Sequence, residues 1–157
     1  MILGEVFSPR TITVSLKGET RDEVFEELID LLAGAYPEIS RADALRAVKE
    51  REAKMSTGIK KGIAVPHGKS ADVKGVVGAV GISRRGIDYD ALDSSPVNLV
   101  FLLLTDPKEC EYHLQVLNTL SNLLDTGAFL SGLTDLKTPQ DVYSRICKFE
   151  SLLASEA

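Results

Sequence analysis

Apolar and polar positions in the first third of the chain follow first the period of a strand and then that of a helix. Residues 11–16 (TITVSL) alternate and are rich in β-branched side chains, which predicts a short strand. Thr20 and Glu23 then form the sequence pattern of a capping box, and apolar residues return behind them at helical spacing. This predicted helix ends before Pro37, because proline cannot continue a helix.

A second helix and three more strands are expected in the middle of the chain. Ser40 and Asp43 repeat the helix start signal, and the more polar segment behind them is expected to end at about Arg51. Short apolar runs predict strands at residues 62–65, 76–83 and 97–104. The last two runs are almost continuously apolar, which is typical of strands covered on both faces.

The last third of the chain predicts three helical stretches. Leucine and valine positions between residues 114 and 124 form one apolar face, and Gly127 is expected to stop that helix. A short piece follows at residues 129–133, and Thr138 with Pro139 marks the start of the last helix. The order of one strand, two helices, three strands and three helices predicts a layered α/β domain with a central mixed sheet.

Composition narrows the class of protein. The chain has 157 residues, which suits one domain over residues 1–157, and 18 Lys+Arg against 23 Asp+Glu give a net charge of -5. This balance argues against nucleic-acid binding, which needs clustered basic residues. The longest apolar run, Leu99–Leu104, is far shorter than the roughly 20 residues of a membrane span. The first residues lack a signal peptide, and Cys110 and Cys147 are interpreted as reduced thiols, so a cytoplasmic protein is expected.

The two histidines are the first candidates for chemistry. His67 follows a predicted buried strand in the sequence Pro66-His67-Gly68, and a stiff turn of this kind would present the imidazole to another macromolecule. The Gly68 backbone could also offer its N–H to an anion. An ordinary turn that contains a histidine is the alternative interpretation. His113 lies at the start of the long predicted helix, where it could converge on His67 or simply cap the helix.

A phosphate site is the hypothesis for a second group of residues. Arg51 is followed by Ser56 and Thr57, and a guanidinium near hydroxyl groups suits a bound phosphate. A surface arginine at a helix end is the alternative. Glycine-rich nucleotide motifs are absent, and Cys110 with His113 has no second pair of ligands, so neither a cofactor nor a metal is expected.

Three segments together resemble a known family. They are Arg51-Glu52 with Ser56-Thr57-Gly58-Ile59, the run Gly62-Ile63-Ala64-Val65-Pro66-His67-Gly68, and His113-Leu114-Gln115-Val116-Leu117. The chain resembles, over nearly its whole length, the IIA domain of the bacterial phosphoenolpyruvate-dependent sugar phosphotransferase system. The likeness is to the fructose/mannitol class, which includes the nitrogen-regulatory IIA proteins.

The resemblance implies a three-layer α/β/α fold with a central mixed sheet, and a phosphoryl relay. His67 would accept a phosphoryl group from the phosphocarrier HPr, or from its nitrogen-branch counterpart. It would then pass the group to a IIB domain or hold it as a regulatory mark that a target recognises. His113 would support the acceptor by hydrogen bonding, and Arg51 would lie close to the phosphate, with Ser56, Thr57 and Gly68 in support. The protein would be associated with a membrane only peripherally, by binding to a permease.

One stretch departs from the family pattern. Ile59-Lys60-Lys61 stands between Gly58 and Gly62, where many members carry a small residue with Asn or His. Two ammonium groups beside the acceptor could attract phosphate or could alter docking to HPr. An apolar rim of Ile59, Ile63 and Val65 is the expected docking surface. The resemblance leaves open both the sugar and the choice between transport and regulation.

Overall fold

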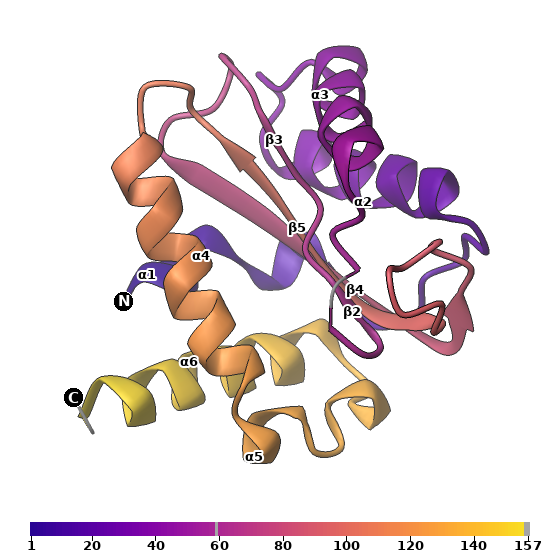
Figure 1. The fold of residues 1–157 in the computed structure, drawn as a ribbon. Helices are drawn as coiled ribbons and strands as arrows, with labels where there is room; N and C mark the ends of the chain where they lie inside the picture. Colours follow the sequence, from indigo (N-terminus) through magenta and orange to yellow (C-terminus); the bar gives the residue numbers. More distant parts are fainter. Residues whose placement is uncertain (59, 156–157) are drawn as a thin grey trace.

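The computed structural model describes residues 1–58 and 60–155 and shows a sheet between two layers of helices (Figure 1). In chain order the elements are α1 (Ile2–Val6), the 3-10 helix η1 (Pro9–Thr11), β1 (Ile12–Thr13), α2 (Arg21–Ala35), α3 (Arg41–Lys54), β2 (Ile63–Ala64), β3 (His67–Lys69), β4 (Val76–Ile87), β5 (Val97–Thr105), α4 (Cys110–Leu124), α5 (Gly127–Leu130), the 3-10 helix η2 (Leu133–Asp135) and α6 (Pro139–Ser155).

The sheet is mixed, as the sequence predicts. Its order is β1-β4-β5-β2, and β3 pairs with β5 on the same edge as β2. The long strands β4 and β5 are antiparallel, whereas β1 runs parallel to β4, and β2 and β3 both run parallel to β5. Between the two short edge strands, the Leu103 N–H donates to the Pro66 carbonyl at 2.9 Å. β2 and β3 therefore act as one interrupted edge strand.

Alternation along β5 divides the core into two halves. Leu99, Phe101 and Leu103 pack with buried residues of α1, α4 and α6. The even-numbered residues between and after them, Leu102 among them, pack instead with buried residues of α2 and α3. Because successive strand side chains point to opposite faces, β5 is covered on both sides. The three-layer α/β/α arrangement is thus confirmed.

Local start signals correctly predicted where three helices, α2, α3 and α6, begin. The Thr20 side chain accepts the Glu23 N–H at the start of α2, and Ser40 does the same for Asp43 at the start of α3. Thr138 likewise accepts the Asp141 N–H at 3.1 Å at the start of α6. Each side chain satisfies a backbone donor that has no partner within its helix.

Several boundaries differ from the predictions: β1 is shorter than expected, β4 runs on to Ile87, and one helix, α1, was not predicted. Helix α3 continues one turn past Arg51 to Lys54. Gly127 does not stop α4: the helix ends at Leu124, Asp125 stays in right-handed helical conformation, and Gly127 begins α5. Helix α1 carries no local start signal, because its anchor is distant in sequence. The Glu150 carboxylate of α6 accepts the Leu3 N–H at 3.0 Å.

The prediction of a turn at Pro66-His67-Gly68 was wrong, because residues 67–69 form β3. Gly68 explains why a strand fits there: a Cβ at this position would lie 2.9 Å from the Val48 backbone nitrogen and 3.0 Å from the Ala47 carbonyl carbon. The α3 backbone therefore rests directly on β3. This close approach places the last turns of α3 beside the imidazole of His67.

Two sequence-based expectations concern membrane spans and cysteines. Within residues 1–58 and 60–155, no helix combines the length with the apolar character that crossing a bilayer requires. Cys110 and Cys147 are free thiols, the first exposed and the second partly buried.

Candidate functional site

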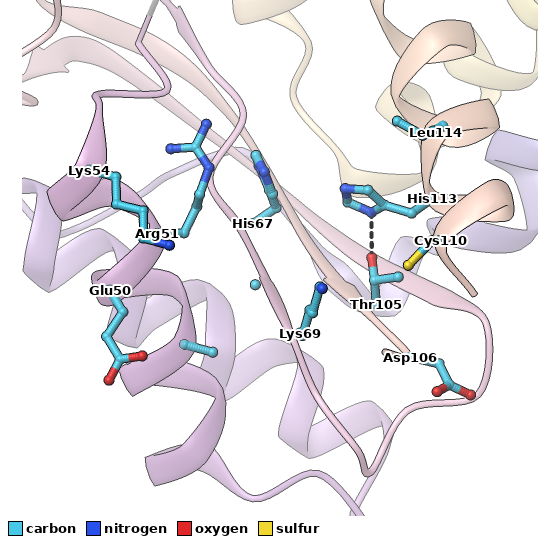
Figure 2. A pocket seen from close by; sticks show the side chains of 12 residues that line it. Glu50, Arg51, Lys54, His67, Lys69, Thr105, Asp106, Cys110, His113 and Leu114 are labelled. Atoms are coloured by element: carbon cyan, nitrogen blue, oxygen red, sulfur yellow. Dashed lines mark hydrogen bonds between the residues drawn. The ribbon is translucent and has the colours of Figure 1, made fainter. Parts of the chain in front are cut away.

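A cleft of about 530 Å³ opens at the edge of the sheet where β3, the end of β5, the end of α3 and the start of α4 meet. Its lining residues are Ala47, Glu50, Arg51, Lys54, His67, Gly68, Lys69, Thr105, Asp106, Cys110, His113 and Leu114. Figure 2 shows His67 near the middle of this cleft, with Arg51 on one side and His113 on the other. The structure thus brings together three residues that the sequence analysis singled out separately.

His67 is fixed by its place at the start of β3. It stands in register with Leu103 of β5, so its side chain lies on the face of the sheet that α4 covers. Its Nδ1 atom is 2.9 Å from the carbonyl oxygen of Val65. A carbonyl can only accept a hydrogen bond, so Nδ1 carries the proton and Nε2 of the neutral ring keeps a free lone pair. The half-buried ring is therefore held with one nucleophilic nitrogen.

His113 lies in the first turn of α4 and faces His67 across the cleft. The two ring centroids are 5.4 Å apart, with an angle of 49° between the ring planes. The Nδ1 atom of His113 is 2.6 Å from the Thr105 hydroxyl oxygen. This contact leaves Nε2 as the ring nitrogen turned towards His67 (Figure 2).

Burial favours the neutral form of both rings. Desolvation lowers the pKa of His67 below its usual value, and the nearby positive charge of Arg51 lowers it further against the opposing effects of the Val65 hydrogen bond and Glu52. Desolvation is also the main cause of the lowered pKa of His113, followed by the charges of His67 and Lys69. Both imidazoles are consequently neutral at pH 7, the state in which a histidine nitrogen is a nucleophile.

We expect both histidines to titrate below 6.5, the usual value from which their pKa values are lowered. Below that pH the unfolded chain binds protons on these rings more readily than the folded chain does. The free energy of unfolding should therefore be constant near neutral pH and fall as the pH drops from about 6.5 towards the folded-state pKa values. Histidine proton NMR and denaturant titrations measure both effects, and ring midpoints at or above the usual value would contradict the expectation.

Arg51 sits in the last turn of α3, where its guanidinium donates to the Met55 carbonyl at 2.9 Å. The last α3 carbonyls have no partner within the helix, so the bond secures both the helix end and the side chain. Lys54 and Lys69 also line the cleft, and together with Arg51 these three cations outnumber the two carboxylates, Glu50 and Asp106. The site therefore has a local excess of positive charge in a chain whose net charge is -5.

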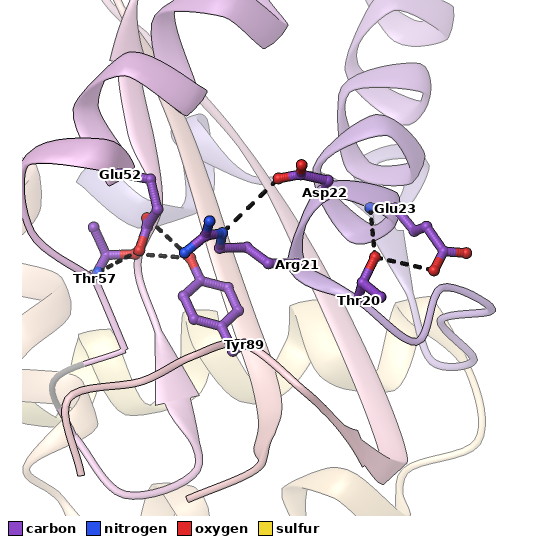
Figure 3. A network of polar contacts seen from close by, with 7 residues as sticks. All are labelled: Thr20, Arg21, Asp22, Glu23, Glu52, Thr57 and Tyr89. Atoms are coloured by element: carbon purple, nitrogen blue, oxygen red, sulfur yellow. Dashed lines mark hydrogen bonds and ion pairs between the residues drawn. The ribbon is translucent and has the colours of Figure 1, made fainter. Parts of the chain in front are cut away.

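Ser56 and Thr57 are not brought to the cleft. Thr57 is buried, and its hydroxyl lies 2.7 Å and its N–H 2.6 Å from the two carboxylate oxygens of Glu52. The Tyr89 hydroxyl completes this cluster at 2.8 Å from the Thr57 hydroxyl (Figure 3). Ser56 accepts the N–H of Gly58. The expectation of direct phosphate contact is corrected for Thr57: the buried carboxylate of Glu52, which sequence reasoning missed, occupies both of its donors.

Gly68 lines the cleft but does not offer its N–H to an anion. In the parallel ladder with β5, the Pro66 carbonyl and the Ser70 N–H both bond to β5, at 2.9 Å each. Alternate residues of a strand point their backbone groups the same way, so the N–H of Gly68 also points into the ladder. Its contribution is the close approach of α3 to β3, which no anion-binding pattern would have predicted.

Lys60 and Lys61, which depart from the family pattern, also lie away from the cleft. The Lys60 ammonium pairs with Asp125 just beyond α4, and neither Lys60 nor Lys61 is among the residues that line the cleft. The expected apolar rim is wrong for Ile63, which is only 6% exposed and packs into the core. Val65 is partly buried, and Ile59 lies outside the described residues. The exposed apolar side chain at the cleft is Leu114, with 64% of its surface accessible.

Three cleft residues were missed because of wrong local predictions. Lys69 lies two positions after His67 on the same face of β3, a spacing that has meaning only in a strand. Lys54 falls in the helical turn that was not predicted. Thr105 ends β5 one residue after the predicted strand, with its side chain on the face towards α4. A two-residue period through 67–69 and 103–105 was the signal that could have found the first and the last.

Comparison with known proteins gives a consistent result. Residues 5–148 match the model of the family described as phosphoenolpyruvate-dependent sugar phosphotransferase system, EIIA 2. The chain is 35% identical over 124 residues to the PTS system fructose-specific EIIABC component of Bacillus subtilis, covering 79% of this chain but only 20% of that longer protein. It is 30% identical over 141 residues to the nitrogen regulatory protein of Pseudomonas aeruginosa, covering 90% of this chain and 92% of that one.

A solved structure agrees with these relatives. The crystal structure of the nitrogen regulatory protein IIA-Ntr from Neisseria meningitidis superposes with a TM-score of 0.85 at 29% sequence identity. The superposition covers 93% of this chain and 99% of that one. Sequence and fold therefore lead to the same group of proteins.

Proposed function

The chain belongs to the EIIA 2 family of the phosphoenolpyruvate-dependent sugar phosphotransferase system, and we propose that it carries a phosphoryl group on the Nε2 atom of His67. One observation carries the proposal. A neutral imidazole that lines a cleft donates its Nδ1 proton to a carbonyl, which leaves the Nε2 lone pair free, and a guanidinium lies on one side of it and a second imidazole on the other. Of the candidate groups in the cleft, His67 is the one prepared in this way to act as a nucleophile.

The transfer step needs no proton to move. The Nε2 lone pair of His67 forms the new N–P bond, while the N–P bond of a phosphohistidine donor breaks and the donor nitrogen keeps the bonding electron pair. The Nδ1 proton stays on its hydrogen bond to Val65 throughout. Onward transfer is the same step in reverse, with a nucleophile of the acceptor protein in place of the donor nitrogen.

Charge in the cleft supports this step. Phosphoryl transfer has a loose transition state whose charge is spread over the outer oxygens, so the protein mainly positions groups and neutralises charge. The Arg51 guanidinium is always charged and can bind two oxygens at once. Its own bond to the Met55 carbonyl holds it in place before the phosphate arrives. Lys54 and Lys69 add positive charge around the same cleft.

The donor we propose is phosphorylated HPr or its nitrogen-branch counterpart, and the acceptor is a IIB domain or a regulatory target. Two features support partners that are proteins. His67 lies on an edge strand of the sheet, within reach of a second macromolecule. The exposed Leu114 gives the cleft an apolar contact point beside its charged groups, and protein interfaces typically combine an apolar centre with a polar rim.

The direct test is phosphoryl uptake. The protein is incubated with phosphoenolpyruvate, the phosphotransferase that charges the carrier, and HPr or its counterpart. We expect intact mass to rise by one phosphoryl group, lost in acid as N–P bonds are, and phosphorus NMR to place it on Nε2 of His67. No uptake from either donor, or attachment to another residue, would refute the proposal.

Regulation without sugar phosphorylation is the second candidate, favoured by the Pseudomonas aeruginosa nitrogen regulatory protein, which matches at nearly full length. The same phosphorylated protein decides between the two. Rapid onward transfer to an added IIB domain supports a transport role. A phosphoryl group that IIB domains do not remove, and that changes binding to a kinase, transporter or transcription factor, supports regulation.

A further inference from the structure

We propose that Thr105 is a positioning residue that sets the proton arrangement of His113, so that its Nε2–H donates to the phosphoryl group on His67. The inference rests on the proposed function and extends it to a residue with no place in the expected site. Thr105 is the last residue of β5 and pairs in register with Lys69 of β3. It shares the face of Leu103 and so points its hydroxyl at α4, where His113 lies.

The contact between the two side chains is short and sheltered. The Thr105 hydroxyl oxygen lies 2.6 Å from the Nδ1 atom of His113, and Thr105 is only 3% exposed. A buried hydroxyl proton without an acceptor carries a desolvation cost, so it needs a partner. Within residues 1–58 and 60–155, the Nδ1 atom of His113 is the one hydrogen-bond partner of this hydroxyl. The Thr105 hydroxyl therefore donates its proton to Nδ1.

Donation by Thr105 decides where the imidazole proton sits. Burial lowers the pKa of His113, so the ring is neutral and carries one N–H. With Nδ1 accepting from Thr105, that proton must lie on Nε2, the nitrogen turned towards His67 (Figure 2). The opposite arrangement would turn a lone pair, and not a donor, towards His67 and the oxygens of a phosphoryl group bound to it. Electrostatics therefore favour the same proton arrangement as the buried hydroxyl does.

The two rings are thus held in complementary states by different partners. The Val65 carbonyl accepts from Nδ1 of His67 and frees its Nε2 as a nucleophile. The Thr105 hydroxyl donates to Nδ1 of His113 and makes its Nε2 a donor. A buried group that selects a histidine tautomer through a hydrogen bond also fixes the direction of the ring.

The test compares Thr105→Val, which keeps the shape and deletes the hydroxyl, with Thr105→Ser, which keeps the hydroxyl. Nitrogen NMR of the unphosphorylated proteins reads the His113 tautomer. Single-turnover uptake from the phosphorylated donor reads the transfer rate. We expect the Nε2–H form in wild type and Thr105→Ser, and its partial loss in Thr105→Val with uptake about threefold to tenfold slower.

Measurements in a His113→Ala background separate positioning from a merely structural role. If Thr105 acts through His113, Thr105→Val should cause no further slowing there. Slowing by the same factor in both backgrounds, failure of Thr105→Ser to restore the rate, or an unchanged tautomer in Thr105→Val would overturn the inference. If the wild type takes up no phosphoryl group, the proposed function fails, whereas the tautomer comparison still decides the role of Thr105.

Discussion

Replacing His67 with alanine is expected to abolish phosphoryl uptake completely. The variant loses the nitrogen with the free lone pair, and His113 cannot substitute for it, because Thr105 occupies its Nδ1 atom and its Nε2 is turned towards the missing ring as a donor. The measurement is intact mass after incubation with the complete phosphorylating mixture. The expected spectrum shows unmodified protein at a time when the wild type is fully converted.

Cys110→Ser is the matched control for this result. Cys110 is a free thiol that also lines the cleft, and sulfur is a second candidate acceptor there. Its replacement should leave uptake at the wild-type level. Uptake that survives in the His67 variant, or that disappears in the Cys110 variant, would move the acceptor away from His67.

Replacing Glu52 with alanine is expected to lower the free energy of unfolding by about 3 kcal/mol. The carboxylate is 4% exposed and accepts hydrogen bonds from the N–H and the hydroxyl of Thr57 and from the Tyr89 hydroxyl. Its removal leaves buried donors without their acceptor. Burial, followed by the negative charge of Glu52, raises the pKa of Tyr89, so the phenol is neutral at pH 7 and serves as a donor to Glu52.

Glu50→Ala is the control for the Glu52 variant, because it makes the same change at an exposed position of the same helix. It should alter the free energy of unfolding by no more than about 0.5 kcal/mol. Urea titrations of the three proteins measure the difference. Equal midpoints for the Glu52 and Glu50 variants would show that the buried cluster does not stabilise the fold.

Short-range patterns were sufficient for most of the fold. Caps such as Thr20 and Ser40 act within one helical turn, and the apolar run of β5 records that both of its faces are covered. These signals predicted a layered α/β domain with a central mixed sheet, and they placed β2 and β5 close to their observed bounds. The three layers were implied by the family resemblance. Local signals could not predict α1, because its N-terminal N–H groups are satisfied by Glu150 at the other end of the chain.

For the site, too, the sequence identified individual residues but not their arrangement in space. The residues around Arg51, His67 and His113 were sufficient to identify the family and to select three candidates. Their meeting in one cleft depended on strand register and on the close approach of α3 to β3 at Gly68, which no local pattern records. Ser56 and Thr57 were misplaced for the same reason, since the buried carboxylate of Glu52 holds Thr57 in the core.

The sequence by itself determined which side chains are available and which segments form helices and strands, because these depend on interactions between residues a few positions apart. Only the tertiary structure decided which nitrogen of each histidine carries the proton. That choice is made by the Val65 carbonyl for His67 and by the Thr105 hydroxyl for His113. The second of these contacts exists because the end of β5 lies beside the start of α4. Packing of this kind between elements does not appear in the sequence as a periodic pattern.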